Sequence, residues 1–139
     1  MWNFSKLVLI GIIAGTVLAV SLKIVRLLTG NPASILLYNM DYIPLLKMWD
    51  EILGAGLLFH FITCIVSVVV LFYFLKPLAL KRNVLPYVVT YTIGGGVLFF
   101  LSALTGTPPA YNDVAAWFYW TAGHTLFGIV VGLLVKKWV

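Results

Sequence analysis

Four long apolar runs constrain this chain more than any other feature of its sequence. They cover residues 7–28, 52–75, 84–104 and 114–135. A helix needs roughly 20 consecutive apolar residues to cross a hydrocarbon core of about 30 Å. Because that core offers no water to backbone amides and carbonyls, and because the alternation of barrel strands is absent, each run is predicted to be a transmembrane α-helix.

The composition agrees with this prediction. Hydrophobic residues make up 63% of the chain and charged residues 9%, against about 25% charged in ordinary soluble domains. These values exclude a soluble globular protein, a disordered tail and a nucleic-acid-binding module. The predicted fold is an all-α integral membrane protein, one domain over residues 1–139 with four transmembrane helices in an antiparallel bundle. Its first partner is the lipid bilayer, and no nucleic acid is expected.

The first apolar run could also be interpreted as a secretory signal peptide. Lys6 precedes it, and Ala19-Val20-Ser21 resembles a cleavage site. The run continues to Leu28, however, which gives it spanning length. We therefore expect a retained transmembrane helix.

Basic residues predict the orientation of the four spans. One side of the two predicted hairpins carries Lys6, Lys76, Lys81, Arg82, Lys136 and Lys137. The other side carries Lys23, Arg26, Lys47 and all four acids, Asp41, Asp50, Glu51 and Asp113. By the positive-inside rule the first side faces the cytoplasm, together with both termini.

The segment between the first two spans, residues 31–49, is too polar to cross the membrane. Asn31 followed by Pro32 indicates a helix N-cap with proline at the first helical position. Either a short interfacial helix on the outer leaflet or a structured loop packed on the bundle fits this pattern. Asn112 or Asp113 is the predicted N-cap of the last span.

Small residues predict where the helices meet. Because lipid is as apolar as leucine, helix contacts in membranes are chosen by small and polar side chains. The candidate packing residues are Gly11, Gly15, Gly94, Gly95, Gly128 and Gly132. Close packing is one use of these faces, and lining a cavity or a substrate path is the other.

Two histidines are expected near the middle of the bilayer. His60 follows Glu51 by nine residues and His124 follows Asp113 by eleven, which places them roughly 14 and 17 Å below the outer boundary. Ionisable side chains at that depth are costly and suggest function. They could join helices by hydrogen bonds, sense or relay protons, or bind a metal. A zinc site wants three or four ligands, and only Cys64 lies near, so no metal or cofactor is predicted.

Two sets of candidate functional residues follow. The proton-sensing or pore-lining set is His60, His124, Thr63, Ser67 and Thr121. The set of charges at the outer mouth is Lys23, Arg26, Asp50, Glu51 and Asp113. The two cations could form ion pairs with these acids or extend to the lipid headgroups. The sequence carries no enzyme motif, and Ser67 is about 10 Å along the helix from His60, too far for a nucleophile and its base. The chain is therefore not expected to be an enzyme.

Several short motifs resemble a known family. They are Leu104-Thr105-Gly106-Thr107-Pro108-Pro109, Ala122-Gly123-His124, Gly11-Ile12-Ile13-Ala14-Gly15 and His60 early in the second span. In these the chain resembles the YagU-type small inner-membrane proteins of bacteria. The chain departs from the family pattern where acidic residues precede Gly-His, since Trp120, Thr121 and Ala122 stand there, and its first loop is shorter. The resemblance implies a four-helix bacterial plasma-membrane protein linked to acid-stress tolerance.

Two functions remain open at this stage. The first is an oligomeric membrane protein that acts as a channel, transporter or sensor for protons or a small solute, with His60 and His124 as its titrating groups. The second is a non-catalytic accessory subunit that packs against a larger membrane protein. The second predicts that small-residue faces such as Gly11 and Gly15, or Gly128 and Gly132, point outward to lipid.

Overall fold

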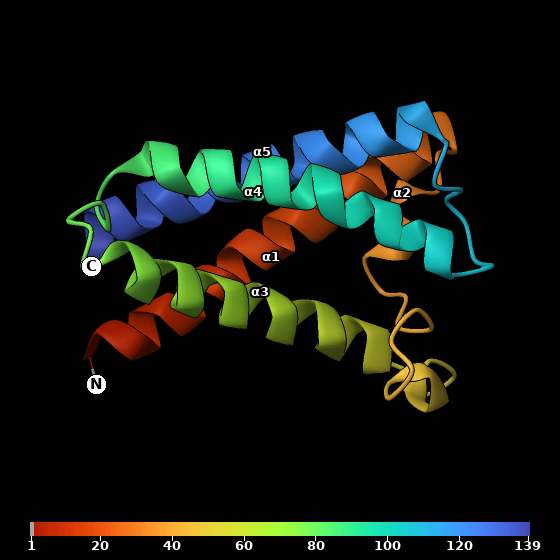
Figure 1. The fold of residues 1–139 in the computed structure, drawn as a ribbon, viewed down its shortest axis with the longest axis horizontal. Helices are drawn as coiled ribbons and strands as arrows, with labels where there is room; N and C mark the ends of the chain where they lie inside the picture. The colour runs from red at the N-terminus through yellow and green to blue at the C-terminus, as the bar shows by residue number, and fades with distance from the viewer. Residues whose placement is uncertain (1) are drawn as a thin grey trace.

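The computed structural model describes residues 2–139 and is all-helical over that range (Figure 1). Its elements are α1 (Trp2–Thr29), α2 (Ala33–Leu36), η1 (Lys47–Trp49), α3 (Ala55–Leu75), α4 (Val84–Leu98), η2 (Phe99–Leu104) and α5 (Val114–Trp138). Four segments are long and apolar enough to cross a membrane: α1, α3, α4 together with η2, and α5. The predicted all-α fold with four transmembrane helices is confirmed.

Side-chain caps define where two of the spans begin. Asp113 Oδ1 accepts a hydrogen bond from the Ala116 amide at 2.9 Å, so Asp113 is the N-cap of α5. Asn83 caps α4 in the same way, through the Leu85 amide at 3.1 Å. The helix α3 begins three residues later than the sequence predicts, because Gly54 holds a left-handed conformation with φ of 84°.

The four spans form an open arc in the order α3, α1, α5, α4. The helix α1 packs against α3 on one side and α5 on the other, and α5 packs against α4. The helices α3 and α4 follow each other in sequence and lie close together at the turn of residues 76–83. Away from this turn they diverge (Figure 1). The predicted bundle is therefore open between α3 and α4.

Both termini lie at one end of the molecule, beside the turn that joins α3 to α4 (Figure 1). The Lys6 ammonium donates a hydrogen bond to the Trp138 carbonyl, which ties the start of α1 to the end of α5. An even number of spans produces this arrangement. The basic residues that were predicted on one side of the membrane all belong to this end.

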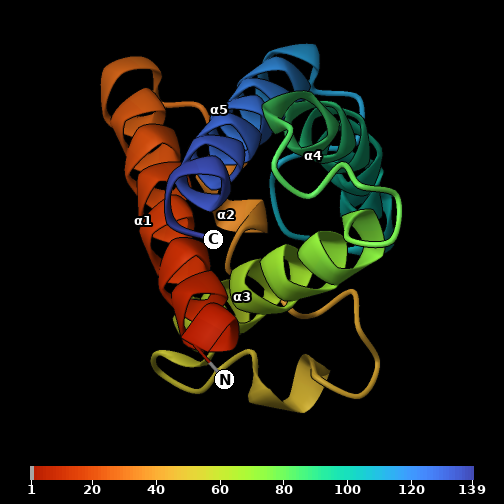
Figure 2. The same cartoon turned by 90° about the vertical axis from the view of Figure 1, so that its left-hand side faces the viewer.

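The segment after α1 enters the bundle at the opposite end. The helix α2 packs against α1 and α5 (Figure 2), and its Ala33, Ser34 and Leu36 are buried. Asn31 Oδ1 accepts a hydrogen bond from the Ala33 amide at 3.0 Å, although the N-cap position itself is held by Pro32. The first part of this segment thus packs on the bundle, whereas η1 has no buried residue.

Candidate functional site: an intramembrane cavity

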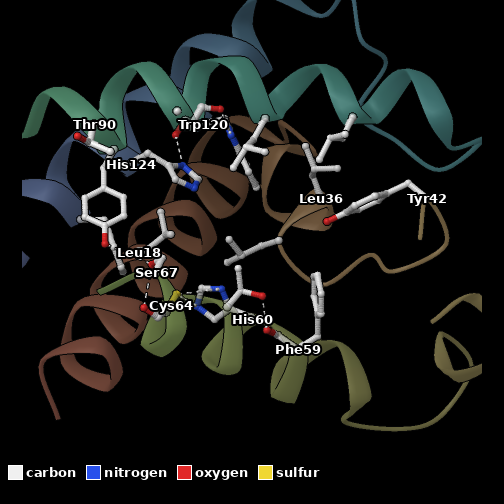
Figure 3. A pocket seen from close by; sticks show the side chains of 18 of the residues that line it. Leu18, Leu36, Tyr42, Phe59, His60, Cys64, Ser67, Thr90, Trp120 and His124 are labelled. Atoms are coloured by element: carbon white, nitrogen blue, oxygen red, sulfur yellow. Dashed lines mark hydrogen bonds between the residues drawn. The ribbon is translucent and has the colours of Figure 1, made fainter. Parts of the chain in front are cut away.

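The inner side of the helix arc contains a cavity of about 550 Å³ (Figure 3). Every transmembrane helix contributes to its lining, and so do α2 and the loop that follows it. Most lining side chains are apolar. The polar ones besides the tyrosines are His60, Thr63, Ser67, Cys64, Thr90 and His124. No Asp, Glu, Lys or Arg is among the lining residues in the part of the chain that the structure describes.

The cavity opens sideways, between α3 and α4. Thr63 of α3 and Thr90 of α4 line it and are also exposed on the outside of the molecule. So is Leu98, which is 50% exposed. These side chains stand on the two helices that diverge from each other. The opening therefore faces the zone that lipid chains occupy around a transmembrane bundle.

Both ends of the cavity are covered. Leu36 of α2 and Tyr42 of the following loop lie at one end (Figure 3). Burial raises the pKa of the Tyr42 phenol, and the neighbouring Asp41 carboxylate raises it further. At the other end Tyr91 Oη donates a hydrogen bond to Ser67 Oγ at 3.3 Å, which links α4 to α3. The exposed lining residues, Thr63, Thr90 and Leu98, thus lie at the sideways opening rather than at either end.

His60 is held against the backbone of α1. Its Nε2 lies 2.9 Å from the Gly15 carbonyl oxygen. Because a carbonyl only accepts, Nε2 carries the hydrogen and Nδ1 is the acceptor of the neutral ring. Nδ1 lies 3.7 Å from Cys64 Sγ. The helices α1 and α3 approach closely here because Gly15 has no side chain. A Cβ at Gly15 would lie 3.1 Å from Cys64 Sγ.

His124 enters the cavity from the opposite wall. Its Nδ1 lies 2.8 Å from the carbonyl oxygen of Trp120 on the same helix, so Nδ1 donates and Nε2 is left as an acceptor. The ring points from α5 into the cavity (Figure 3). The Trp120 indole in turn donates to the Gly95 carbonyl at 2.8 Å. Two helices therefore fix the position of this imidazole.

The structure brings together most of the predicted pore-lining set. His60, Thr63, Ser67 and His124 all line the one cavity. Thr121 does not. It lies in the contact between α4 and α5, where a Cβ at Gly96 would be 3.4 Å from its Oγ1. That oxygen is buried without a hydrogen-bond partner.

Sequence reasoning missed part of the lining. Tyr91, Thr90 and Trp120 border the cavity but were not among the candidate site residues. Gly94 was expected at a helix contact, yet it lines the cavity and a Cβ there would meet nothing within 4 Å. The available signal was the shared face of Tyr91 and Gly94, three residues apart on one helix.

The other candidate packing glycines lie at contacts within the chain. A Cβ at Gly11 would lie 2.7 Å from Ile65 Cα of α3. One at Gly128 would lie 2.9 Å from the Tyr87 carbonyl oxygen, and one at Gly132 would lie 2.8 Å from Val84 Cγ1. The first contact joins α1 to α3, and the other two join α5 to α4.

The candidate outer-mouth charges lie around the far end of the bundle. Lys23, Arg26 and Glu51 are exposed. Asp113 caps α5, and Asp50 Oδ1 accepts a hydrogen bond from a backbone amide at 3.0 Å. These acids satisfy backbone groups, and the exposure of the two cations favours extension to the headgroups. Within residues 2–139 no three His, Cys, Asp or Glu side chains form a group that could hold a metal ion.

Neither a protein-family model, nor a curated protein, nor a solved structure matches this chain.

Proposed function

We propose that this protein admits a small solute to its intramembrane cavity in a pH-dependent way. It thereby contributes to proton or small-solute permeation, or to pH sensing. The single observation that supports this proposal is that His60 of α3 and His124 of α5 line one cavity. Concave, mostly apolar sites with a few polar groups are the usual form of small-molecule sites.

The two histidines supply the response to pH. Each ring has one nitrogen occupied by a backbone carbonyl, at Gly15 or at Trp120. A second proton must therefore go to the other nitrogen. The remaining titratable side chains at the cavity are Cys64, Tyr91 and Tyr42, from α3, α4 and the loop after α2. None of these is a carboxylate that could balance an imidazolium.

An unbalanced imidazolium in this setting attracts water. A charge in a low-dielectric cavity is stabilised only by a partner or by hydration. Histidine titrates near neutral pH, unlike the other side chains around it. Acidification is therefore expected to hydrate the cavity and to increase the passage of protons or of the solute.

Liposome flux measurements test the proposal. Purified protein is reconstituted, and proton flux is recorded from about pH 4 to 7.5, a range wide enough to include the change of charge of histidines held in an apolar cavity. The matched variant is His60→Gln with His124→Gln, because glutamine keeps a donor for the carbonyl but does not titrate in this range. Wild-type flux should rise as the pH falls, and the double variant should give a flat profile. An unchanged pH response in a folded double variant would overturn the proposal.

The alternative, an accessory subunit, is less well supported. It expects small-residue faces that point to lipid, but Gly11 contacts α3, and Gly128 and Gly132 contact α4. These small-residue faces pack against other helices of the same chain. Purification of a stoichiometric partner protein would nevertheless favour this alternative, and a symmetric homo-oligomer would favour the first proposal.

The cellular setting belongs to the same proposal. We place the protein in the bacterial plasma membrane with both termini in the cytoplasm, as the basic residues at that end indicate. Its resemblance to YagU-type proteins adds a link to acid-stress tolerance. Acid survival of a deletion strain, complemented with wild type or the double glutamine variant, tests this link.

A further inference from the structure

We propose that the solute of this cavity is an uncharged amphiphile, with an apolar body and one hydroxyl-type end, and that it enters from the lipid between α3 and α4. This inference rests on the proposed function, since it names the class of molecule that the cavity takes. Three features of the cavity lead to it: the charge of the lining, the position of its polar groups and the place of its opening.

The lining selects against charge. The described residues around the cavity include no acidic side chain, lysine or arginine. An ionised group moved into such a site loses its hydration and gains no partner, which is strongly unfavourable. An uncharged molecule avoids this cost. The volume of about 550 Å³ lies within the range of sites that hold drug-sized ligands.

The polar groups define one end of the ligand. His124 Nε2 is the accepting nitrogen of a ring that points into the cavity, so it fits a hydroxyl donor. The linked hydroxyls of Ser67 on α3 and Tyr91 on α4 also line the site. Leu18 and Phe127 add apolar surface. The hydroxyl of such a molecule would bind the polar side chains, and its apolar body would pack against the apolar part of the lining.

The opening indicates the route. Thr63 and Thr90 are both lining and exposed, and they stand on the two helices that diverge. The ends of the cavity are covered, by Leu36 and Tyr42 on one side and by the hydrogen bond between Tyr91 and Ser67 on the other. A molecule dissolved in the bilayer therefore reaches His124 without crossing either end.

Photolabelling tests the class of solute. The full chain in lipid nanodiscs is labelled with an octanol that carries a diazirine, and labelled peptides are identified by mass spectrometry. Excess octanol should reduce labelling of cavity residues roughly tenfold, as mass action gives at about ten times the Kd. Octyltrimethylammonium, of the same chain length but charged, should not. Cavity labelling that octanol fails to reduce, or that the ammonium compound reduces equally, would overturn the inference.

A matched pair of variants locates the site. Gly94→Phe fills the cavity from a position where a Cβ meets nothing within 4 Å, so it should fold and lose the competable labelling. Ile93→Phe adds the same ring on the same helix at a position that is 63% exposed, and should keep it. Thermal unfolding of both variants verifies the fold. Labelling of Gly94→Phe at the wild-type level would contradict the inference.

The experiments distinguish a failure of the proposed function from a failure of the proposed ligand class. Competition by octanol without pH-dependent flux would support the ligand class and remove the proposed function. Histidine-dependent flux without competition by octanol would support the proposed function and overturn the ligand class.

Discussion

Gly95 of α4 and His124 of α5 lie in direct contact: a Cβ on Gly95 would be 2.5 Å from both the Cβ and the Cγ of His124. This approach lets the Trp120 indole reach the Gly95 carbonyl. The contact therefore holds two helices together and also fixes the imidazole that enters the cavity.

The first prediction concerns this contact. Gly95→Ala should lower the free energy of unfolding by about 1–3 kcal/mol, because the added methyl overpacks the helix contact. Gly94→Ala is the matched control, since a Cβ there has open space and alanine is the better helix former by up to about 1 kcal/mol. Thermal unfolding in one detergent compares the two. Equal midpoints would show that the close approach does not constrain α4.

The second prediction compares two tryptophans that donate to neighbouring carbonyls. Trp120 bonds to Gly95 and is 6% exposed, whereas Trp117 bonds to Gly96 and is 37% exposed. A hydrogen bond contributes about 1 kcal/mol, and more is lost when a buried partner stays unsatisfied. Trp120→Phe should thus destabilise the protein more than Trp117→Phe. Unfolding midpoints and pH-dependent flux of both variants provide the measurement, and the reverse order would contradict it.

The third prediction concerns Asp41, whose Oδ2 accepts from Thr105 Oγ1 at 2.7 Å and Thr107 Oγ1 at 3.1 Å. This carboxylate joins the segment after α2 to the loop before α5. Because hydrogen bonds to charged groups contribute about 1.5–3 kcal/mol, Asp41→Ala should increase amide exchange in residues 104–107. Glu51→Gln, at an exposed acid of the same end, should leave exchange there unchanged. If the loop before α5 exchanged its amides as slowly in Asp41→Ala as in the wild type, Asp41 would not be what holds this loop.

The fourth prediction concerns orientation. In a Cys64→Ala background, single cysteines at Lys81 and Leu53 should react with a membrane-impermeant maleimide from opposite sides. Lys81 lies in the basic turn between α3 and α4, and Leu53 is fully exposed before α3. The positive-inside rule places Lys81 in the cytoplasm. Labelling of Lys81→Cys in intact cells would invert the proposed topology.

The spans were predictable from the sequence because each is selected by its own hydropathy. The predicted start of the last span agrees with the cap at Asp113. The start of α3 differs because Gly54 adopts a left-handed conformation, and hydropathy does not report backbone conformation. Residues 52–54 are apolar or small, so the pattern extends beyond the helix.

The candidate site was only partly predictable. Similar depths for His60 and His124 follow from the rise per residue and from the polar residue that precedes each span. Which neighbour a face meets does not follow from depth. Thr121 and His124 lie three residues apart on α5, yet Thr121 turns to α4 and only His124 lines the cavity.

The sequence by itself determined that four helices cross the membrane, since the cost of exposing backbone groups and charges to lipid acts on each segment separately. Only the tertiary structure decided that α3 and α4 stand apart and leave a cavity between them. The physical reason is that helices in lipid gain nothing from apolar character alone. Their neighbours are chosen by close contacts, such as Gly11 with Ile65 and Gly128 with the Tyr87 carbonyl, which no single segment specifies.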